Sequence, residues 1–420
     1  MLINKFVTVH KEKIKDMPTS DDLLKSLAHG FMPQEEMLEV ARKKSSLQIG
    51  IPKETSIQEK RIPLVPDAVA LLVNNGHEVI IETGAGEGCS FSDKDYSEAG
   101  AQIVYGTEEV YKANMILKVE PPTLEEIDMM QHGQLLISAL QLPIQPKDFL
   151  KKLISKKITA VAFDFIKDPD GILPIVTAMS EIAGNTAILI AAEYLSNQRN
   201  GQGQMFGGIS GVSPTEVVIL GAGTVGEFAA RTAVGLGASV KVFDNNIHKL
   251  RRLQTAVGQR LQTSIVQPKV LLKALKSADV VIGAISSKIG RAPIIVTEDM
   301  VKCMKDYSVI VDVSIDKGGC IETSEITSHQ APVFAKHGVI HYCVPNIASR
   351  VARTASYALS NVIAPTILDT GEYGGIEAMI RSYVGIQNGV YIYKGILTNK
   401  YLAETFNMPY KDINLLLMAM

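Results

Sequence analysis

A glycine-rich turn beside a short apolar run is the clearest indication of chemistry in this sequence. Residues 217–220 are apolar, and Gly221, Gly223 and Gly226 follow at the spacing GxGxxG. The first glycine allows a tight turn, the second lets a pyrophosphate approach the backbone, and the third permits close helix packing. A helix that begins here would point free N–H groups at the phosphates. The turn therefore predicts a dinucleotide site that includes Thr224 and Val225.

The residues after the turn complete the pattern. A helix-forming run at 228–236 is followed by a predicted strand at 239–243 that ends in Asp244. The Asp244 carboxylate can accept hydrogen bonds from both ribose hydroxyls of NAD, whereas it would repel a 2′-phosphate, so NAD is favoured over NADP. Strand, helix, strand and acid occur in the required order, which favours a nucleotide-binding βαβ unit over an isolated glycine turn. The alternative is a Rossmann-like unit that has lost its ligand.

Three polar residues mark the ends of predicted strands in the N-terminal half. They are Arg61 after the strand at 47–51, Lys118 near the end of 115–119, and Gln141 after 135–140. A further strand is predicted at 158–165. Open parallel sheets bind ligands beyond the carboxyl ends of their strands, so Arg61, Lys118 and Gln141 are candidates to line one crevice.

Length and composition limit the possible classes of protein. A chain of 420 residues favours two domains, and 46% hydrophobic residues support a globular fold. The net charge of −2 and the pI near 6.5 give no reason to expect a nucleic acid or an anionic membrane as partner. We expect no membrane span, because no apolar run reaches the required length, and no signal peptide, because the first thirty residues are too charged. The sequence thus predicts a cytoplasmic protein.

The cysteines do not indicate a disulfide framework or a zinc site. Cys89, Cys303, Cys320 and Cys343 are scattered, with no CxxC and no histidine at ligand spacing. We predict small buried hydrophobic residues at these positions and no metal site.

The order of predicted elements suggests how the chain is divided. Residues 1–48 contain two possible helices and form an N-terminal extension without recognisable chemistry. A long helix at 179–196 would lead into the nucleotide-binding part, and another at 354–364 would lead back.

Several segments, taken together, resemble one known family. They are IGIPKE (49–54) with Arg61, MILKVEPP (115–122), AMSEIAGNTA (178–187), the glycine turn, VDVSIDKGGCIETS (311–324), GVIHYC (338–343) and YKGILTNKYLAETFNMPY (393–410). In this order they resemble the alanine dehydrogenases, which share ancestry with the nucleotide-binding α part of proton-translocating transhydrogenases. The similarity extends over about residues 47 to 415.

The resemblance implies an α/β fold of two Rossmann-like, doubly wound domains separated by a cleft. The catalytic domain would be discontinuous, formed by residues 49–176 and 350–420 around an NAD-binding domain at 177–349. The implied reaction is oxidative deamination of L-alanine to pyruvate and ammonia with NAD. The implied assembly is a homo-oligomer, usually a hexamer, with a dimer as the alternative.

The resemblance also implies roles for individual residues. Arg61 matches the arginine that binds the substrate carboxylate, as a guanidinium fork would. Lys118 matches a lysine that binds the substrate carboxylate or carbonyl oxygen. Asp316 matches the acid between the nicotinamide ribose and the substrate. Ser180 matches a serine that contacts the cofactor, although helix capping also explains a serine there.

Two positions depart from the family pattern. Asn346 and Ile347 match a loop over the nicotinamide, but the sequence VPNIASRVART replaces the family's Asn-Met-Pro-Gly loop. Gln141 stands where the family has an acid–base histidine, and an amide does not titrate near neutral pH.

Three interpretations of Gln141 are compatible with the sequence. Asp316, a water or a histidine such as His132 carries the proton; or the substrate is another 2-amino acid, because Ala139 replaces a bulkier residue; or the chain binds NAD without turnover. We favour an active dehydrogenase with Asp316, Gln141 and Lys118 at its centre. A nucleotide-binding transhydrogenase subunit is the less favoured alternative.

Overall fold

The computed structural model describes residues 45–420 except 57, 142–145, 200, 287–289 and 419–420. The predicted helical extension at 1–48 therefore lies almost wholly outside the described residues. The described chain is α/β and contains two separate sheets, both dominated by parallel pairing. The predicted fold class of two Rossmann-like doubly wound domains is confirmed.

The first sheet has eight strands in the order β15-β14-β6-β5-β4-β1-β2-β3. Its strands are β1 (Gln48–Ile51), β2 (Glu78–Glu82), β3 (Gln102–Val104), β4 (Met115–Leu117), β5 (Leu135–Ser138), β6 (Thr159–Ala162), β14 (Val390–Tyr393) and β15 (Ile396–Leu397). The six N-terminal strands are parallel, while β14 pairs antiparallel with β6 and with β15. Because β14 and β15 come from the end of the chain, this domain is discontinuous, as predicted.

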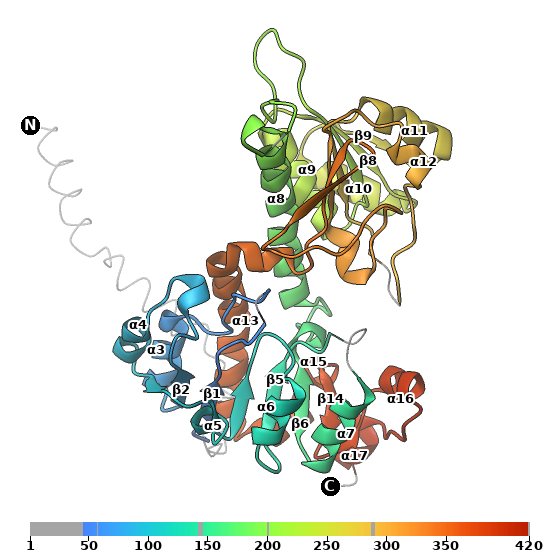
Figure 1. The fold of residues 1–420 in the computed structure, drawn as a ribbon. Coiled ribbons are helices and arrows are strands. Elements are labelled where there is room, and N and C mark those ends of the chain that lie inside the picture. Colours follow the sequence, from blue (N-terminus) through green and yellow to red (C-terminus); the bar gives the residue numbers. More distant parts are fainter. Residues whose placement is uncertain (1–44, 57, 142–145, 200, 287–289, 419–420) are drawn as a thin grey trace, which may run out of the picture. The chain divides into compact units, whose positions relative to one another are not determined.

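Short helices connect and cover these strands (Figure 1). They are α3 (Pro66–Asn74), α4 (Asp93–Glu98), α5 (Thr107–Val110), α6 (Leu124–Met129), α7 (Lys147–Ser155), α14 (Ile376–Ser382), α15 (Val384–Gln387), α16 (Lys400–Phe406) and α17 (Ile413–Met418), with single 3₁₀ turns at η2 (Glu87–Cys89) and η4 (Phe163–Phe165). The strand order reverses between β1 and β4, so loops after these strands diverge and leave a crevice at their carboxyl ends.

The second sheet has seven strands in the order β12-β13-β11-β10-β7-β8-β9. Its elements are β7 (Glu216–Leu220), α9 (Thr224–Gly235), β8 (Ser239–Phe243), α10 (Ile247–Val257), β9 (Gln262–Ser264), α11 (Pro268–Ser277), β10 (Val280–Gly283), α12 (Glu298–Val301), β11 (Val309–Asp312), η6 (Val313–Lys317), β12 (Val333–Lys336) and β13 (Val339–Tyr342). Only β12 is antiparallel to its neighbour. Here the order reverses between β7 and β10, beside the glycine turn.

Two long helices connect the sheets in sequence. Helix α8 (Pro174–Leu195) leads toward β7 by way of η5 (Asn197–Arg199), and α13 (Ala352–Glu372) follows η7 (Ile347–Val351). The sequence placed both helices correctly but made them too short. Helix α8 starts at Pro174 because proline suits the first turn, where its missing N–H has no partner to lose.

Helix α8 is also the one helix, among the described residues, long and apolar enough to cross a membrane by length and composition alone. The expectation that no apolar segment reaches that length is therefore wrong for α8. Its buried residues, such as Ala187 and Ile190, belong to the apolar core of the second sheet, and the helix packs on α9 and α13. A buried core helix passes the same test of length and hydropathy.

Candidate active site

The glycine turn has the geometry that the sequence predicts. Gly221 has φ +110°, and a Cβ there would lie 2.3 Å from the Ala284 carbonyl oxygen at the end of β10. At Gly226 a Cβ would lie 1.9 Å from the Gly221 carbonyl oxygen, so any side chain would push α9 away from the turn. No atom lies within 4 Å of a Cβ built on Gly223. The turn thus packs tightly on its inner side and leaves open space on its outer side.

Asp244 is held beside this turn by backbone N–H groups. Its Oδ2 accepts a hydrogen bond from Ala222 N at 2.8 Å, and its Oδ1 accepts one from Asn246 N at 2.7 Å. These bonds fix a buried carboxylate next to the start of α9, with acceptor capacity left on both oxygens. A diol is therefore a suitable ligand for Asp244, whereas a phosphate would meet its negative charge.

These residues fit a bound NAD. The N-terminal turn of α9, which begins at Thr224, has no side-chain cap, so its N–H groups can donate to a pyrophosphate. The open side of Gly223 gives the phosphates access to that backbone. The individual contacts of Gly221, Gly223, Thr224, Gly226 and Asp244 with the cofactor stay predictions.

Helix α8 reaches this region because one glycine lets it approach α9 closely. A Cβ on Gly184 would lie 2.4 Å from the Val225 carbonyl oxygen. Ser180 lies four residues earlier, on the same face of α8, and Ser180 and Val225 both line a cavity next to the turn. Ser180 lies six residues after Pro174, inside α8 and not at its start, so capping does not explain a serine there.

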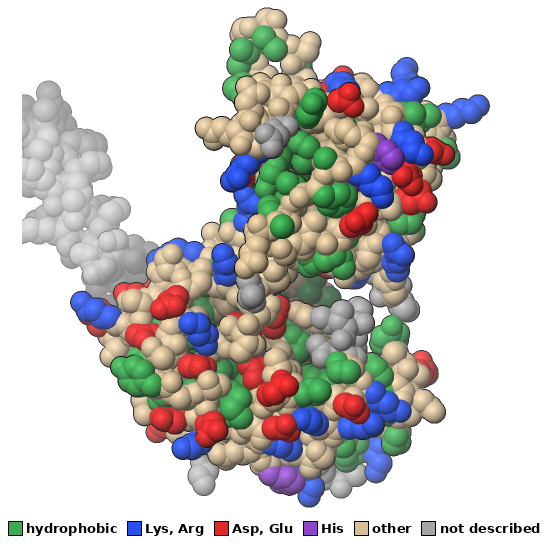
Figure 2. Space-filling view, viewed as in Figure 1, with side chains coloured by type: hydrophobic (Ala, Val, Ile, Leu, Met, Phe, Trp, Pro, Cys, Tyr) green, Lys and Arg blue, Asp and Glu red, His purple; other side chains and the backbone are tan. Residues whose placement is uncertain are grey.

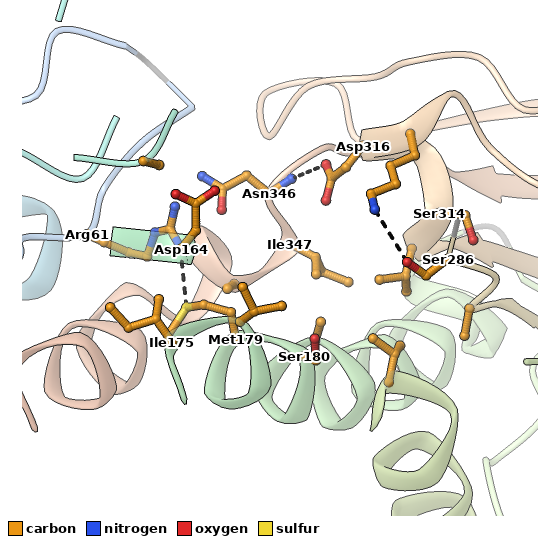
Figure 3. A pocket seen from close by; sticks show the side chains of 18 of the residues that line it. Arg61, Asp164, Ile175, Met179, Ser180, Ser286, Ser314, Asp316, Asn346 and Ile347 are labelled. Atoms are coloured by element: carbon orange, nitrogen blue, oxygen red, sulfur yellow. Dashed lines mark hydrogen bonds between the residues drawn. The ribbon is translucent and has the colours of Figure 1, made fainter. Parts of the chain in front are cut away.

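The cavity has a volume of about 320 Å³ and is lined from both sheets and from α8 (Figure 3). Arg61 and Asp164 come from loops at the carboxyl ends of β1 and β6. From the nucleotide-binding side the polar lining residues are Ser286, Ser314, Asp316, Lys317 and Asn346. Apolar side chains such as Ala139, Ile175, Met179 and Ile347 form much of the remaining wall. A volume of this order suits a small ligand.

Arg61 is fixed by a buried acid two residues earlier. Its Nε donates to Glu59 Oε1 at 2.8 Å, and its Nη2 donates to Glu59 Oε2 at 2.6 Å, a bidentate pair. Its Nη1 points to Met179 Sδ on α8, 3.3 Å away. Burial raises the pKa of Glu59, but the Arg61 charge together with the hydrogen bonds from Arg61 and Asn346 outweighs this and holds the pKa below its usual value. Arg61 is therefore an oriented cation with N–H groups left for a second carboxylate.

Asn346 connects Arg61's partner to Asp316. Its side-chain Nδ2 donates to Glu59 Oε2 at 2.7 Å, and its backbone N donates to Asp316 Oδ1 at 2.9 Å. The backbone of Asn346 is left-handed, with φ 56°, a conformation that asparagine tolerates better than most residues. One residue thus connects the wall that carries Arg61 with the wall that carries Asp316.

Asp316 is accessible to solvent on one side, yet protein crowds its carboxyl group. Desolvation raises its pKa, while the Asn346 N–H and the Arg61 charge oppose the shift. Asp312, four residues earlier, accepts hydrogen bonds from Ser314 N, Cys320 N and Ser324 Oγ inside the protein. Asp312 thus shapes the η6 turn that presents Asp316.

Asp164 is the second carboxyl group in the cavity. Its Oδ1 atom is buried and has no hydrogen-bond partner among the described residues. Burial raises its pKa to about 6, and the backbone N–H groups of Asp164 and Leu140 oppose the shift. A carboxyl group with this pKa exchanges a proton near neutral pH.

Lys118 lies outside the cavity lining. Its Nζ is 2.9 Å from Glu126 Oε1 and 3.2 Å from Glu54 Oε2, and its side chain is 1% exposed. Glu54 also accepts a hydrogen bond from Val119 N at 2.6 Å, and burial raises the Glu54 pKa to about 7. A lysine in a buried strand end requires such partners. The role of Lys118 in substrate binding stays a prediction that its position does not support.

Gln141 and His132 are placed differently. Gln141 follows β5 with φ 45° and is half-buried, but it is not among the residues lining the cavity. The Leu140 N–H beside it nevertheless acts on the Asp164 carboxyl. His132 is exposed and precedes β5, at the opposite end of the strand from the cavity. His132 is therefore poorly placed to carry a proton in this site.

Sequence reasoning missed Glu59 and Asp164. Glu59 could have been predicted, because an acid two residues before an arginine that binds a substrate carboxylate can form an ion pair with that arginine and orient it. Asp164 could also have been predicted, because it follows β6, a strand whose end was predicted to face the crevice. The rule that selected Arg61, Lys118 and Gln141 applies equally to Asp164.

Acidic and basic side chains are interspersed on the face shown in Figure 2. In the described part of the chain, no group of three or more His, Cys, Asp or Glu side chains is arranged to hold a metal ion. Cys89, Cys320 and Cys343 are buried as predicted, whereas Cys303 is exposed, which corrects that part of the prediction.

The fold and the site define a two-domain nucleotide-binding α/β protein with an oriented arginine and carboxyl groups next to its glycine turn. Residues 50–183 match the family model "Alanine dehydrogenase/PNT, N-terminal domain", and residues 187–400 match "Alanine dehydrogenase/PNT, C-terminal domain". The chain belongs to the alanine dehydrogenase/PNT family.

Relatives support the same assignment over nearly their whole length. The chain is 40% identical to "Alanine dehydrogenase 2" of Staphylococcus aureus over 368 residues, 87% of this chain and 98% of that protein. It is 41% identical to "Alanine dehydrogenase" of Methanococcus maripaludis over 364 residues, 86% of this chain and 97% of that protein.

Solved structures agree. An L-alanine dehydrogenase matches with a TM-score of 0.81 and 39% identity, covering 86% of this chain and 99% of that one. A transhydrogenase from Sinorhizobium meliloti matches with a TM-score of 0.72 and 22% identity, covering 84% and 99%, and shows the shared fold.

Proposed function

We propose that this chain catalyses NAD-dependent oxidative deamination of a small 2-amino acid, with L-alanine giving pyruvate and ammonia as the leading reaction. The observation that carries the proposal is the single cavity in which Arg61 and Asp316 are connected through Glu59 and Asn346, beside a complete dinucleotide turn. Relatives at about 40% identity that carry the name alanine dehydrogenase support the substrate.

Arg61 binds the substrate carboxylate in this proposal. Its Nε and one Nη2 hydrogen are used by Glu59, which leaves further N–H groups for the substrate. Because Glu59 and Met179 fix the guanidinium, the carboxylate is held in one orientation and Cα takes a defined position. The apolar residues Ala139 and Ile175 suit a small apolar side chain.

Bound NAD supplies the hydride acceptor for the substrate Cα. Asp316 holds the substrate ammonium group with its carboxylate, in an orientation fixed by the Asn346 N–H. Ile347 and Val225 exclude water from the cavity next to the turn. Loss of one proton to water and of a hydride converts the ammonium form of the amino acid to a protonated imine, and water then releases ammonia.

The test is NADH formation from a panel of L-amino acids with the purified full-length protein. We expect turnover with L-alanine and slower turnover with larger apolar amino acids. Arg61→Lys keeps the charge but cannot form the bidentate pair, so the KM for the amino acid should rise about a hundredfold while the Kd for NAD is unchanged. Arg251→Lys, an exposed arginine on α10, is the matched control and should change neither value.

The competing function is NAD binding without turnover. Gln141 at the histidine position is the observation that favours it, because a neutral amide accepts no proton. Measurable NAD binding without NADH formation from any amino acid of the panel would establish this alternative. Hydride exchange with NADPH and a second protein would instead support a transhydrogenase subunit.

The proposal includes a cytoplasmic homo-oligomer, with a hexamer as the expected size and a dimer as the alternative. Exposed apolar side chains at Leu189, Met205 and Leu236 line one surface pocket and support self-association, because an exposed apolar patch marks a contact surface. Light scattering on the purified protein measures the size of the assembly.

A further inference from the structure

We propose that Asp164 is the group that transfers protons between water and the substrate nitrogen after hydride transfer, a task that Gln141 cannot perform. The inference rests on the proposed dehydrogenase function. The starting observation is that Asp164 lines the cavity. Its carboxyl group is not needed to bind the dinucleotide at the glycine turn or to bind the substrate carboxylate.

The position of Asp164 is the first argument. It lines the same cavity as Arg61 and Asp316, in the 3₁₀ turn that directly follows β6 (Figure 3). The Leu140 backbone N–H, next to Gln141, acts on its carboxyl group. Asp164 therefore lies at the end of β6, the strand that pairs with β5, and so beside the strand end where the acid–base residue was expected. A rigid strand end positions such a group well.

The unused bonding capacity of Asp164 is the second argument. Buried polar atoms in folded proteins almost always have a partner, and an exception requires an explanation. Asp164 Oδ1 has none among the described residues, and none of them forms an ion pair with it. Asp164 is only half-buried as a residue and lines the cavity, so a turn of its side chain would bring Oδ1 to a substrate water as that partner.

The surroundings of Asp164 make it able to exchange a proton. The charged and titratable groups that face it are Arg61, Asp316 and Lys317 across the cavity and Tyr391 on β14. Burial is the largest cause of the shift and raises the Asp164 pKa to about 6, although the backbone N–H groups of Asp164 and Leu140 oppose it. This value is close to the pH at which an acid–base group is most effective. The pKa of Tyr391 is raised chiefly by burial and, to a smaller extent, by the charge of Asp164.

Other groups are less suitable. Asp316 already accepts the Asn346 N–H and holds the substrate ammonium in the proposed function. His329 has a buried Nε2 without a partner among the described residues, but it does not line the cavity. His132 is exposed at the far end of β5.

The proton transfers balance as follows. Water adds to the carbon of the protonated imine and forms a C–O bond, while one water proton passes to the Asp164 carboxylate. Asp164 then returns this proton to the nitrogen. As the C–N bond breaks and the carbonyl forms, the hydroxyl proton passes through Asp164 to the leaving ammonia. The products are the 2-keto acid and ammonium, and Asp164 is again ionised.

The experiment compares wild-type protein, Asp164→Asn and Asp164→Glu in single-turnover and steady-state assays with L-alanine and NAD. Hydride transfer precedes the proposed step, so Asp164→Asn should form one equivalent of NADH rapidly and then turn over roughly a hundredfold more slowly. Asp164→Glu should retain part of the steady-state rate. Asp170→Asn, an exposed acid in the following turn, is the control and should behave as wild type.

The pH profile of kcat gives a second readout. Because the ionised form accepts the proton, wild-type kcat should fall as the pH drops through about 6, and Asp164→Asn should lose this limb. Unchanged steady-state turnover in Asp164→Asn, or slow NADH formation already in the first turnover, would overturn the assignment. Absence of turnover in the wild-type protein would instead overturn the proposed function.

Discussion

Asn346 Nδ2 donates a 2.7 Å hydrogen bond to Glu59 Oε2, although 287 residues separate the two along the chain. Glu59 orients Arg61, and the backbone N–H of Asn346 orients Asp316. The expected cation and the expected acid of the site are therefore positioned by one shared residue. A change at Asn346 should affect substrate binding even though the cation itself is untouched.

Replacing Asn346 with glycine tests this coupling. Glycine keeps the left-handed backbone at φ 56° without strain, and it keeps the N–H that Asp316 accepts. The variant removes only the bond to Glu59, a hydrogen bond to a charged group, so KM for the amino acid should rise roughly tenfold. Steady-state kinetics with L-alanine measures it, and an unchanged KM would mean that Glu59 holds Arg61 unaided.

Asp244→Asn should weaken discrimination between the two nicotinamide cofactors. The variant removes the negative charge that would repel a 2′-phosphate and keeps one carbonyl acceptor near Ala222 N. We expect the ratio of kcat/KM for NAD to that for NADP to fall about tenfold or more, as for loss of a charge-assisted bond. Asp299→Asn, an exposed acid in the same domain, should leave the ratio unchanged. An unaltered ratio in Asp244→Asn would remove Asp244 from cofactor selection.

The sequence predicted the parts of the fold that depend on local pattern. The apolar run before Gly221 and the acid after β8 specify a βαβ unit, because the strand, the glycine turn and the acid each occur at the spacing that dinucleotide binding requires. Strands β9 and β12 were not predicted, since both are short and neither is fully buried, so their apolar signal is weak. Short strands of this kind are defined by pairing with a neighbour, which a local pattern does not contain.

The site was predicted less completely for a related reason. Arg61, Asp316 and Asn346 were recognised singly, but the bond from Asn346 to Glu59 depends on how distant segments meet. Lys118 was selected because it lies near the end of a predicted strand, and in the structure its charge is paired with two buried carboxylates, those of Glu54 and Glu126.

Lys118→Met should therefore act on stability more than on substrate binding. It leaves Glu54 and Glu126 buried without their cation, which should lower the free energy of unfolding by about 3–5 kcal/mol. Combining it with Glu126→Gln should recover part of the loss. Denaturant unfolding and KM for L-alanine are measured together. A large increase in KM at unchanged stability would support direct contact between Lys118 and the substrate.

His341 should make stability depend on pH in the acid range. It is fully buried on β13, its Nε2 pairs with Thr323 Oγ1 at 2.8 Å, and burial lowers its pKa from 6.5 to about 4. The unfolded chain binds a proton below pH 6.5 and the folded chain does not, so stability is lost as the pH falls from 6.5 toward 4, by about 3 kcal/mol at most. His341→Gln should flatten this part of the curve of unfolding free energy against pH, and an equal slope would contradict the assignment.

Gln141→His places a titratable ring at the end of β5, where φ 45° is tolerated by histidine. If the missing base limited turnover, this variant alone would raise kcat. Because Asp164 is proposed to carry the proton, we expect little change in the wild-type background and a recovery of roughly tenfold in the Asp164→Asn background, where one acid–base group is restored. Steady-state kinetics of the wild-type protein, the two single variants and the double variant gives a double-mutant cycle, which measures the coupling between positions 141 and 164. A large gain from Gln141→His in the presence of Asp164 would show that Asp164 does not serve as the base.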